Sequence, residues 1–128
     1  MPLSVLRILL YVQLLLGLVK YIGARIGLPP LGHVFDVHEL IGVIVAILAI
    51  YALRPLSGVQ DTGVRMAARF FPLLPLVLGI GFVAIPNLVS TPHIVLLHMV
   101  LGIATIALVE IASAQQRRSQ RRRPSFAG

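Results

Sequence analysis

Four long apolar segments constrain the fold of this chain more than any other feature of its sequence. In a chain of 128 residues they cover about 3–23, 33–53, 64–85 and 92–114. An α-helix rises about 1.5 Å per residue, so each segment is long enough to cross a hydrocarbon core of about 30 Å. Only helices and closed barrels satisfy their backbone polar groups in lipid. The segments therefore predict an all-α integral membrane protein, a four-helix bundle that runs up, down, up and down.

The composition agrees with a membrane protein and excludes several other classes. Hydrophobic residues make up 58% of the chain and charged residues only 12%, which is too little polar surface for a soluble domain. The chain has no cysteine, so it has no disulfide framework and no thiolate metal site. No nucleophile and base can be assembled with a third orienting group, so we do not expect a hydrolase.

Basic residues are distributed unevenly between the two sides of the predicted bundle. Nine of the eleven lie at the termini or in the middle loop, namely Arg7, Arg54, Arg65, Arg69, Arg117, Arg118, Arg121, Arg122 and Arg123. Because cytoplasmic loops carry the excess of Lys and Arg, we expect both termini in the cytoplasm. Residues 1–115 would form the transmembrane domain and 116–128 a basic cytoplasmic tail. We expect this tail to face anionic lipid rather than nucleic acid, in the cytoplasmic membrane of a bacterium or archaeon.

A histidine and glycine pattern, H-x4-H-x3-G, occurs twice in the chain. It reads HVFDVHELIG over 33–42 and returns sixty positions later as HIVLLHMVLG over 93–102. The second histidine and the glycine are four residues apart, so on a helix they share one face. The first histidine is five residues from the second and points about 140° away from it. Each copy therefore presents one imidazole beside one bare patch of backbone.

The repeat extends to the helices that precede the histidines. Arg7 and Gly17 match Arg69 and Gly79 at an offset of 62 residues. The chain thus reads as two copies of one helical hairpin. The first segment forms half of the first hairpin of this repeat. We therefore expect it to be retained rather than removed as a signal peptide.

Helix geometry predicts that the repeated residues meet at one depth. Gly17 and Gly79 would lie about 20 Å above the inner boundary, and His38 and His98 about 8 Å below the outer one. Across a core of about 30 Å these levels nearly coincide. The second and fourth helices of such a bundle lie on a diagonal, so their imidazoles face each other across space that glycine leaves clear. This arrangement suits a flat macrocycle with an axial ligand on each side, and haem b without covalent attachment is the simplest candidate.

On these residues the chain resembles the membrane b-type cytochromes, in which a four-helix bundle holds haem between histidines beside glycines that admit the ring. The matching residues are His38, His98, Gly17, Gly42, Gly79 and Gly102. The resemblance implies a haem b electron-transfer protein or cytochrome subunit, with one bis-histidine haem near the extracytoplasmic face and one-electron cycling of iron. The chain differs from members of this family with two stacked haems, because the two histidines on each of its helices are only five residues apart. We therefore do not expect a complete electron path across the membrane.

Four polar residues accompany the histidine layer on the outer side, namely Lys20, Arg25, His33 and His93. They are candidates for binding the haem propionates or the head group of a quinol, and a quinone is a second candidate cofactor. The alternative is that they are interfacial residues without a ligand. On the inner side, Glu110 is expected to pair with Arg54 or Arg69.

Two other functions fit the same pattern. The chain could be a non-catalytic subunit of a larger membrane complex, with histidines used in helix packing. It could also bind another ligand through histidine, such as chlorophyll through single imidazoles or Cu or Zn through several. If the chain is redox-active, it is an electron carrier or part of a quinol-linked oxidoreductase. Assembly with itself or with other subunits is open in each case.

Overall fold

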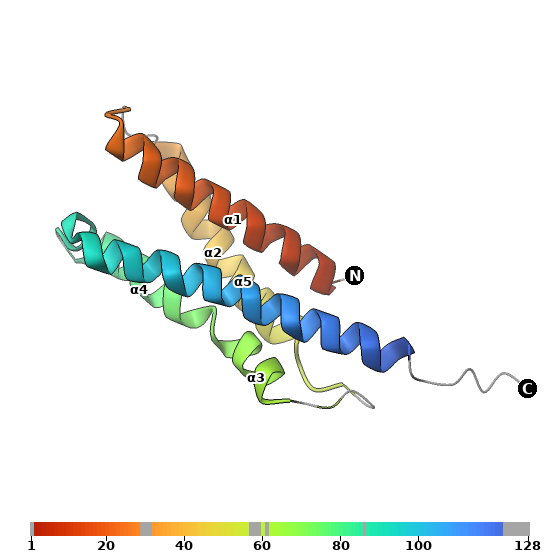
Figure 1. Cartoon of the computed structure of the whole chain (residues 1–128). Helices are drawn as coiled ribbons and strands as arrows, with labels where there is room; N and C mark the ends of the chain where they lie inside the picture. The colour runs from red at the N-terminus through yellow and green to blue at the C-terminus, as the bar shows by residue number, and fades with distance from the viewer. Residues whose placement is uncertain (1, 29–31, 57–59, 61, 86, 122–128) are drawn as a thin grey trace, which may run out of the picture.

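The fold is helical throughout the part of the chain that the structure describes, as the sequence predicts (Figure 1). The computed structural model describes residues 2–28, 32–56, 60, 62–85 and 87–121, with the side chains of 32–36 left out. Within them lie five α-helices and one 3₁₀ turn, namely α1 (Pro2–Arg25), α2 (Gly32–Ala52), α3 (Gly63–Phe70), α4 (Leu73–Ala84), η1 (Leu88–Ser90) and α5 (Pro92–Arg121).

The third apolar segment is divided into two helices at Phe71 and Pro72. Thr62 begins α3, since its Oγ1 accepts a hydrogen bond from the backbone N–H of Arg65 at 3.2 Å. Pro72 then precedes α4 and Pro75 lies in its first turn. Proline has no N–H to donate and its ring crowds the preceding turn, so the helix cannot run through this point without a break. The kink that the sequence predicts is therefore located at Phe71 and Pro72, in the N-terminal half of the segment.

The last helix is longer than the sequence predicts. We expected it to end near residue 114 and the basic tail to begin at 116, but α5 continues to Arg121. Gln and Arg are good helix formers, and basic side chains in a last turn complement the negative end of the helix dipole. The remainder of the predicted tail, 122–128, lies outside the described residues.

The helices contact one another in a closed order. α1 packs along α2, α2 contacts α3 and α4, these two contact α5, and α5 contacts α1. In Figure 1, α1 begins and α5 ends at the same end of the molecule, and α3 lies near that end. Each helix thus has neighbours on two sides, and a space bounded by α1, α2, α4 and α5 is left between them.

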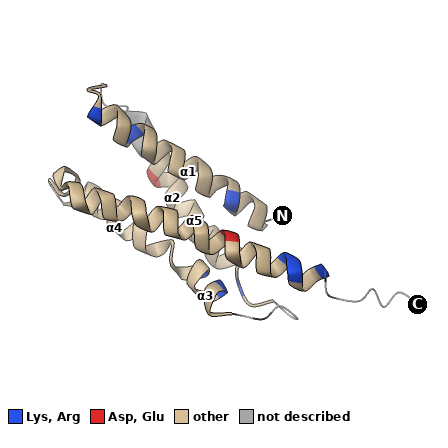
Figure 2. Cartoon of the chain, viewed as in Figure 1, with Lys and Arg blue, Asp and Glu red and all other residues tan. Residues whose placement is uncertain are grey.

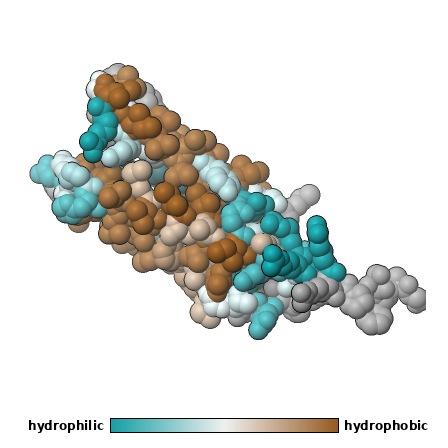
Figure 3. Space-filling view, in the orientation of Figure 1, coloured by the Kyte–Doolittle hydropathy of each residue, from teal (hydrophilic) through white to brown (hydrophobic). Residues whose placement is uncertain are grey.

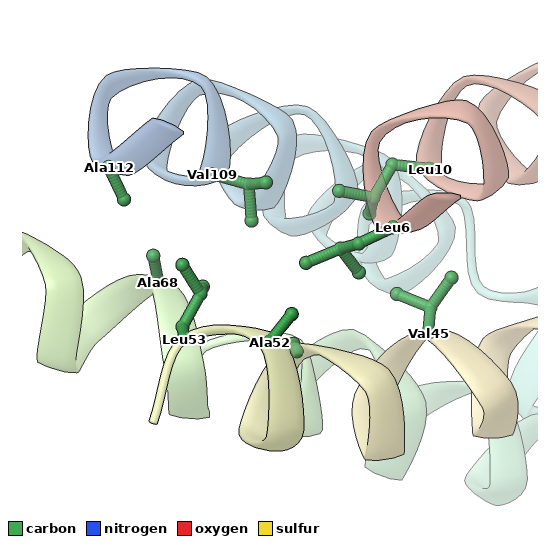
Figure 4. Packing of buried hydrophobic residues seen from close by; sticks show 9 residues of the cluster. Leu6, Leu10, Val45, Ala52, Leu53, Ala68, Val109 and Ala112 are labelled. Carbon is green, nitrogen blue, oxygen red and sulfur yellow. The ribbon is translucent and has the colours of Figure 1, made fainter. Parts of the chain in front are cut away.

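The best packed part of the molecule is the end at which α1 begins and α5 ends. Its hydrophobic cluster consists of Leu6, Leu10, Val45, Ala49, Ala52, Leu53, Ala68, Val109 and Ala112 (Figure 4). Several members are alanine, which lets helix backbones approach closely. The cluster closes the space between the helices at this end. The histidines lie further toward the other end.

Polar contacts also tie the helices together near this end. Arg7 of α1 and Glu110 of α5 form an ion pair with an Nε to Oε1 distance of 2.7 Å, and Tyr11 donates its hydroxyl to the same oxygen at 3.2 Å. The partner of Glu110 is therefore Arg7, and not Arg54 or Arg69 as expected from the sequence. The buried Arg65 of α3 donates to Gln116 Oε1 at 2.8 Å, which holds α3 against α5.

The surface is apolar along the middle of the molecule and polar toward its ends (Figure 3). Lys and Arg residues gather on α3 and the last turns of α5, with others near both ends of α1 (Figure 2). Among the described residues, three helical segments are long and apolar enough to cross a membrane, namely Pro2–Arg25, Gly63–Ala84 and Pro92–Arg121. The described apolar part of α2, Val37–Ala52, is shorter. These segments indicate a membrane protein.

Candidate functional site

A cavity of about 480 Å³ lies between α1, α2, α4 and α5. Its size falls within the range of small-molecule and cofactor sites, about 300–1,000 Å³. Six of its lining residues are the ones that the repeat singles out: His38, His98, Gly17, Gly42, Gly79 and Gly102. The others are mostly apolar, namely Leu10, Gln13, Leu14, Leu18, Glu39, Leu40, Val43, Val45, Pro72, Pro75, Leu76, Ile80, Val83, Met99, Thr105 and Ile106.

The two imidazoles approach each other from α2 and α5. The ring centroids of His38 and His98 are 6.2 Å apart, and the ring planes are inclined by 59°. The ring of Phe82 stands edge-on to His98 with a centroid distance of 5.3 Å. Nδ1 of each histidine is buried and has no hydrogen-bond partner in the described part of the chain. Because a buried polar atom is normally paired, each imidazole has unused bonding capacity in this structure.

The glycines on α1 and α4 lie against these imidazoles in the same way in both hairpins. A Cβ at Gly17 would be 3.1 Å from Cε1 of His38, and a Cβ at Gly79 would be 3.5 Å from Cε1 of His98. The first distance is too short for an unstrained contact. A Cβ at position 17 would therefore require the imidazole to move by a few tenths of an ångström. The sequence repeat is therefore also a structural repeat at the level of the site.

The glycines on the histidine helices differ from each other. A Cβ at Gly42 would be 3.1 Å from Nε2 of Gln13, whereas a Cβ at Gly102 would meet nothing within 4 Å. The cavity is therefore open beside Gly102. On the other side, the Gln13 side chain occupies the space that Gly42 leaves clear.

Gln13 is the site residue that the sequence analysis missed. Its Nε2 is 3.4 Å from Nε2 of His38, and its Oε1 is buried without a hydrogen bond. Two signals in the sequence could have revealed it. It is an uncharged polar residue inside a membrane segment, where such residues usually have a function, and it lies one helical turn before Gly17, on the same face.

Of the four predicted outer residues, Lys20, Arg25 and His93 are not among the described residues that line the cavity. Arg25 donates to the hydroxyl of Tyr21 at 3.1 Å and lies over its ring. His93 is exposed in the first turn of α5, and the side chain of His33 lies outside the described residues. Lys20 interacts electrostatically with Glu39, which does line the cavity. Of the outer residues, Lys20 therefore has the clearest link to the site.

Comparison with protein-family models, with curated proteins and with solved structures found no match to this chain. The chemistry of the site must therefore be derived from its own residues. In the described part of the chain, no group of three or more His, Cys, Asp or Glu residues could hold a metal ion. The described residues that line the cavity and could ligate are the two imidazoles, whose ring centroids are 6.2 Å apart, together with Glu39 and Met99.

Proposed function

We propose that this chain is a membrane-embedded haem b electron-transfer protein or cytochrome subunit, with one haem b held by His38 and His98. The observation that carries the proposal is the pair of imidazoles that face each other in a cavity of about 480 Å³. Each of the four surrounding helices contributes one glycine to that cavity, namely Gly17, Gly42, Gly79 and Gly102. Glycine leaves the backbone bare, so a flat ring can approach it closely.

The spacing of the imidazoles supports the proposal. A bond from a histidine nitrogen to a first-row metal is about 2.0 Å long, and with about 1 Å from nitrogen to ring centre, two trans imidazoles have centroids about 6 Å apart. The observed distance is 6.2 Å. The separation of the two rings therefore agrees with two histidine ligands on one metal ion.

The number of protein ligands favours a macrocycle over a bare metal ion. Zinc sites usually take three or four protein ligands, whereas haem iron needs only axial ligands from the protein. Two imidazoles fulfil that requirement, and Nδ1 of each ring has no hydrogen-bond partner among the described residues.

The protein residues would bind the haem and tune it, while the haem supplies reversible one-electron chemistry. His38 and His98 would hold the haem iron as its two protein ligands, which would leave little capacity to bind oxygen. The apolar lining would exclude water and set a low local dielectric, which is one of the factors that set a haem potential. Lys20, the outer residue linked to the cavity through Glu39, is placed to interact with a propionate or a quinol head group. Electrons would then be exchanged at the outer face with quinol or a partner subunit.

The membrane arrangement belongs to the same proposal. We infer that α2 crosses the bilayer beside α1, since it packs along α1 and its 21 residues span about 31 Å at 1.5 Å per residue. The bundle would run up, down, up and down, with the arginine-rich end in the cytoplasm. The histidine layer would then lie in the outer half of the membrane.

This topology predicts opposite labelling of two engineered cysteines, and the natural chain has no cysteine to interfere. Gln120→Cys lies in the last turn of α5 and Ser90→Cys at the end of η1, and both positions are exposed. In intact cells, a membrane-impermeant maleimide should label Cys at position 90 and leave position 120 unlabelled until the membrane is permeabilised. The reverse pattern would show that the arginine-rich end faces outward.

The function itself is tested by an optical titration of the detergent-purified protein with haem. We expect saturation at one haem per chain, and a spectrum of low-spin, six-coordinate haem b in both the oxidised and the dithionite-reduced state. Folding is checked by circular dichroism on the same samples. A helical, monodisperse protein that takes up no haem would refute the proposal. The cavity would then have to be explained by helix packing in a larger complex or by another ligand that binds through histidine.

A further inference from the structure

Four residues that line the cavity are also exposed on the outside of the molecule. These mouth residues are Leu40 and Val43 of α2 and Ile80 and Val83 of α4, and they are between 40% and 66% exposed. A residue that both lines a cavity and is exposed lies where the cavity reaches the surface. Among the described residues, α5 contributes no exposed residue to the lining and α1 contributes only Leu18, which is 38% exposed. The main opening of the cavity is therefore on the side of α2 and α4.

The mouth residues border one gap between these two helices. α2 and α4 are in contact at Gly42, where a Cβ would be 3.8 Å from Cδ1 of Leu76. Ile80 and Val83 lie four and seven residues after Leu76, so they continue its row along α4. The two mouth residues of α2 are three positions apart and also share one side of their helix. The gap thus runs from Leu76 toward the end of α4.

The same gap is closed in the direction of the packed end of the molecule. Ala46 lies three residues after Val43 on α2 and is only 2% exposed. Pro72 lies four residues before Leu76 on α4 and is also buried. The hydrophobic cluster closes the space between the helices beyond this level. The opening is therefore confined to the half of the molecule that contains the histidines.

The opening is apolar, and it lies within the part of the chain that can cross a membrane. All four mouth residues are aliphatic, and the pair on α4 belongs to the membrane-crossing segment Gly63–Ala84. Lys20, Arg25 and His93 are not among the described residues that line the cavity, and the charged lining residue Glu39 is half-buried. Lipid chains are as apolar as leucine, so in a bilayer the gap faces lipid rather than water.

We propose that the gap between α2 and α4 is a lateral portal through which the ligand of the cavity enters from the lipid phase and leaves to it. The inference rests on the proposed function only insofar as this ligand is haem. The portal favours molecules that partition into the bilayer, such as a free macrocycle with apolar faces, and disfavours hydrophilic molecules and hydrated metal ions. Before the ligand binds, acyl chains of bilayer lipids reach the cavity through the same gap.

The first experiment tests whether acyl chains reach the cavity of the haem-free protein in lipid nanodiscs. The probe is a phosphatidylcholine with a diazirine partway along one acyl chain, and mass spectrometry locates the photolabel on α5. We expect label at His98, which lines the cavity, and at Val100, which is exposed and does not. In the portal variant, Leu40→Trp with Ile80→Trp, the two indole rings should fill the gap. Label at His98 should then be lost, and label at Val100 should remain as the reference.

The matched control variant is Ile47→Trp with Val77→Trp. These residues lie on the same two helices and are exposed, but they do not line the cavity. Circular dichroism of both variants checks that they fold. The control variant should carry the wild-type label at His98.

The second experiment measures how fast haem enters and leaves the protein. Haem is supplied in phosphatidylcholine vesicles, and its release is followed with an excess of a haem-binding apoprotein. A portal affects passage alone, so in the portal variant both rates should fall by the same factor, at least about 10-fold, with unchanged haem affinity. In the control variant both rates should equal those of the wild type.

Three results would overturn the inference: no label at His98 in the wild type, equal label at His98 in the portal and control variants, or wild-type rates of haem entry and release in the portal variant. The inference and the proposed function fail separately. A wild type that binds no haem refutes the function, while photolabelling of the haem-free protein still decides whether the cavity is open to lipid between α2 and α4.

Discussion

Replacement of either His38 or His98 by alanine is expected to abolish six-coordinate haem binding, with a loss of haem affinity of at least about 100-fold. Substitution of residues that merely orient a metal ligand costs about 10- to 100-fold, so loss of the ligand itself should exceed that range. The two substitutions should have similar effects, because the two histidines occupy equivalent places in the two hairpins. The measurement is a haem titration of each purified variant, with oxidised and reduced spectra.

The matched controls are Ile47→Ala on α2 and Ile103→Ala on α5, whose side chains are 64% and 53% exposed and do not line the cavity. They remove apolar groups from the same helices and should bind haem as the wild type does. Loss of binding in only one histidine variant would contradict a bis-histidine site and would indicate a single axial ligand, as chlorophyll uses. Wild-type binding in both variants would show that the cavity between them does not hold the haem.

The layer of histidines and glycines could be predicted from the sequence because it depends on few quantities. Helix rise, membrane thickness and the alternation of helix direction set the depth of Gly17, Gly79, His38 and His98. The structure places Gly17 against His38 and Gly79 against His98. No knowledge of side-chain packing is needed for that result.

The contact between Gln13 and His38 could not be predicted in the same way. Depth alone places it within one turn of Gly17, but its contact with His38 depends on how α1 is rotated about its axis. That rotation is set by packing against two neighbours, here through residues such as Leu6 and Leu10. A sequence pattern of 3.6-residue periodicity is weak in a helix that is apolar on all sides, so it does not identify the inward face.

The ion pair of Arg7 and Glu110 was missed for a related reason. The two residues are 103 positions apart, and their pairing requires that the first and last helices are neighbours at that depth. The expected partners, Arg54 after the second segment and Arg69 within the third, are both nearer to Glu110 in the sequence. The positions of helix ends were also difficult to predict, since α5 continues to Arg121 through residues that are polar but favour helix.

Replacement of Gly102 by leucine is expected to have opposite effects on the haem-free and the haem-bound protein. A Cβ at position 102 meets nothing within 4 Å, so the haem-free protein has room for a larger side chain. Removal of a glycine from the interior of α5 should stabilise the helix by about 0.5–1 kcal/mol. The same side chain would occupy space needed by the macrocycle. Overpacking typically costs about 1–3 kcal/mol, so we expect haem affinity to fall about 10- to 100-fold.

The test compares thermal unfolding without haem and haem titration for the wild type, Gly102→Leu and Gly63→Leu. Gly63 is the matched control, since a Cβ there also meets nothing within 4 Å but the residue lies at the start of α3, away from the cavity. Gly102→Leu should unfold at or above the wild-type temperature and bind haem poorly, whereas Gly63→Leu should bind haem normally. If the histidines served only for helix packing, no ligand would lie in the space beside Gly102. Normal haem binding by Gly102→Leu would therefore show that the ring does not lie beside α5 in this cavity.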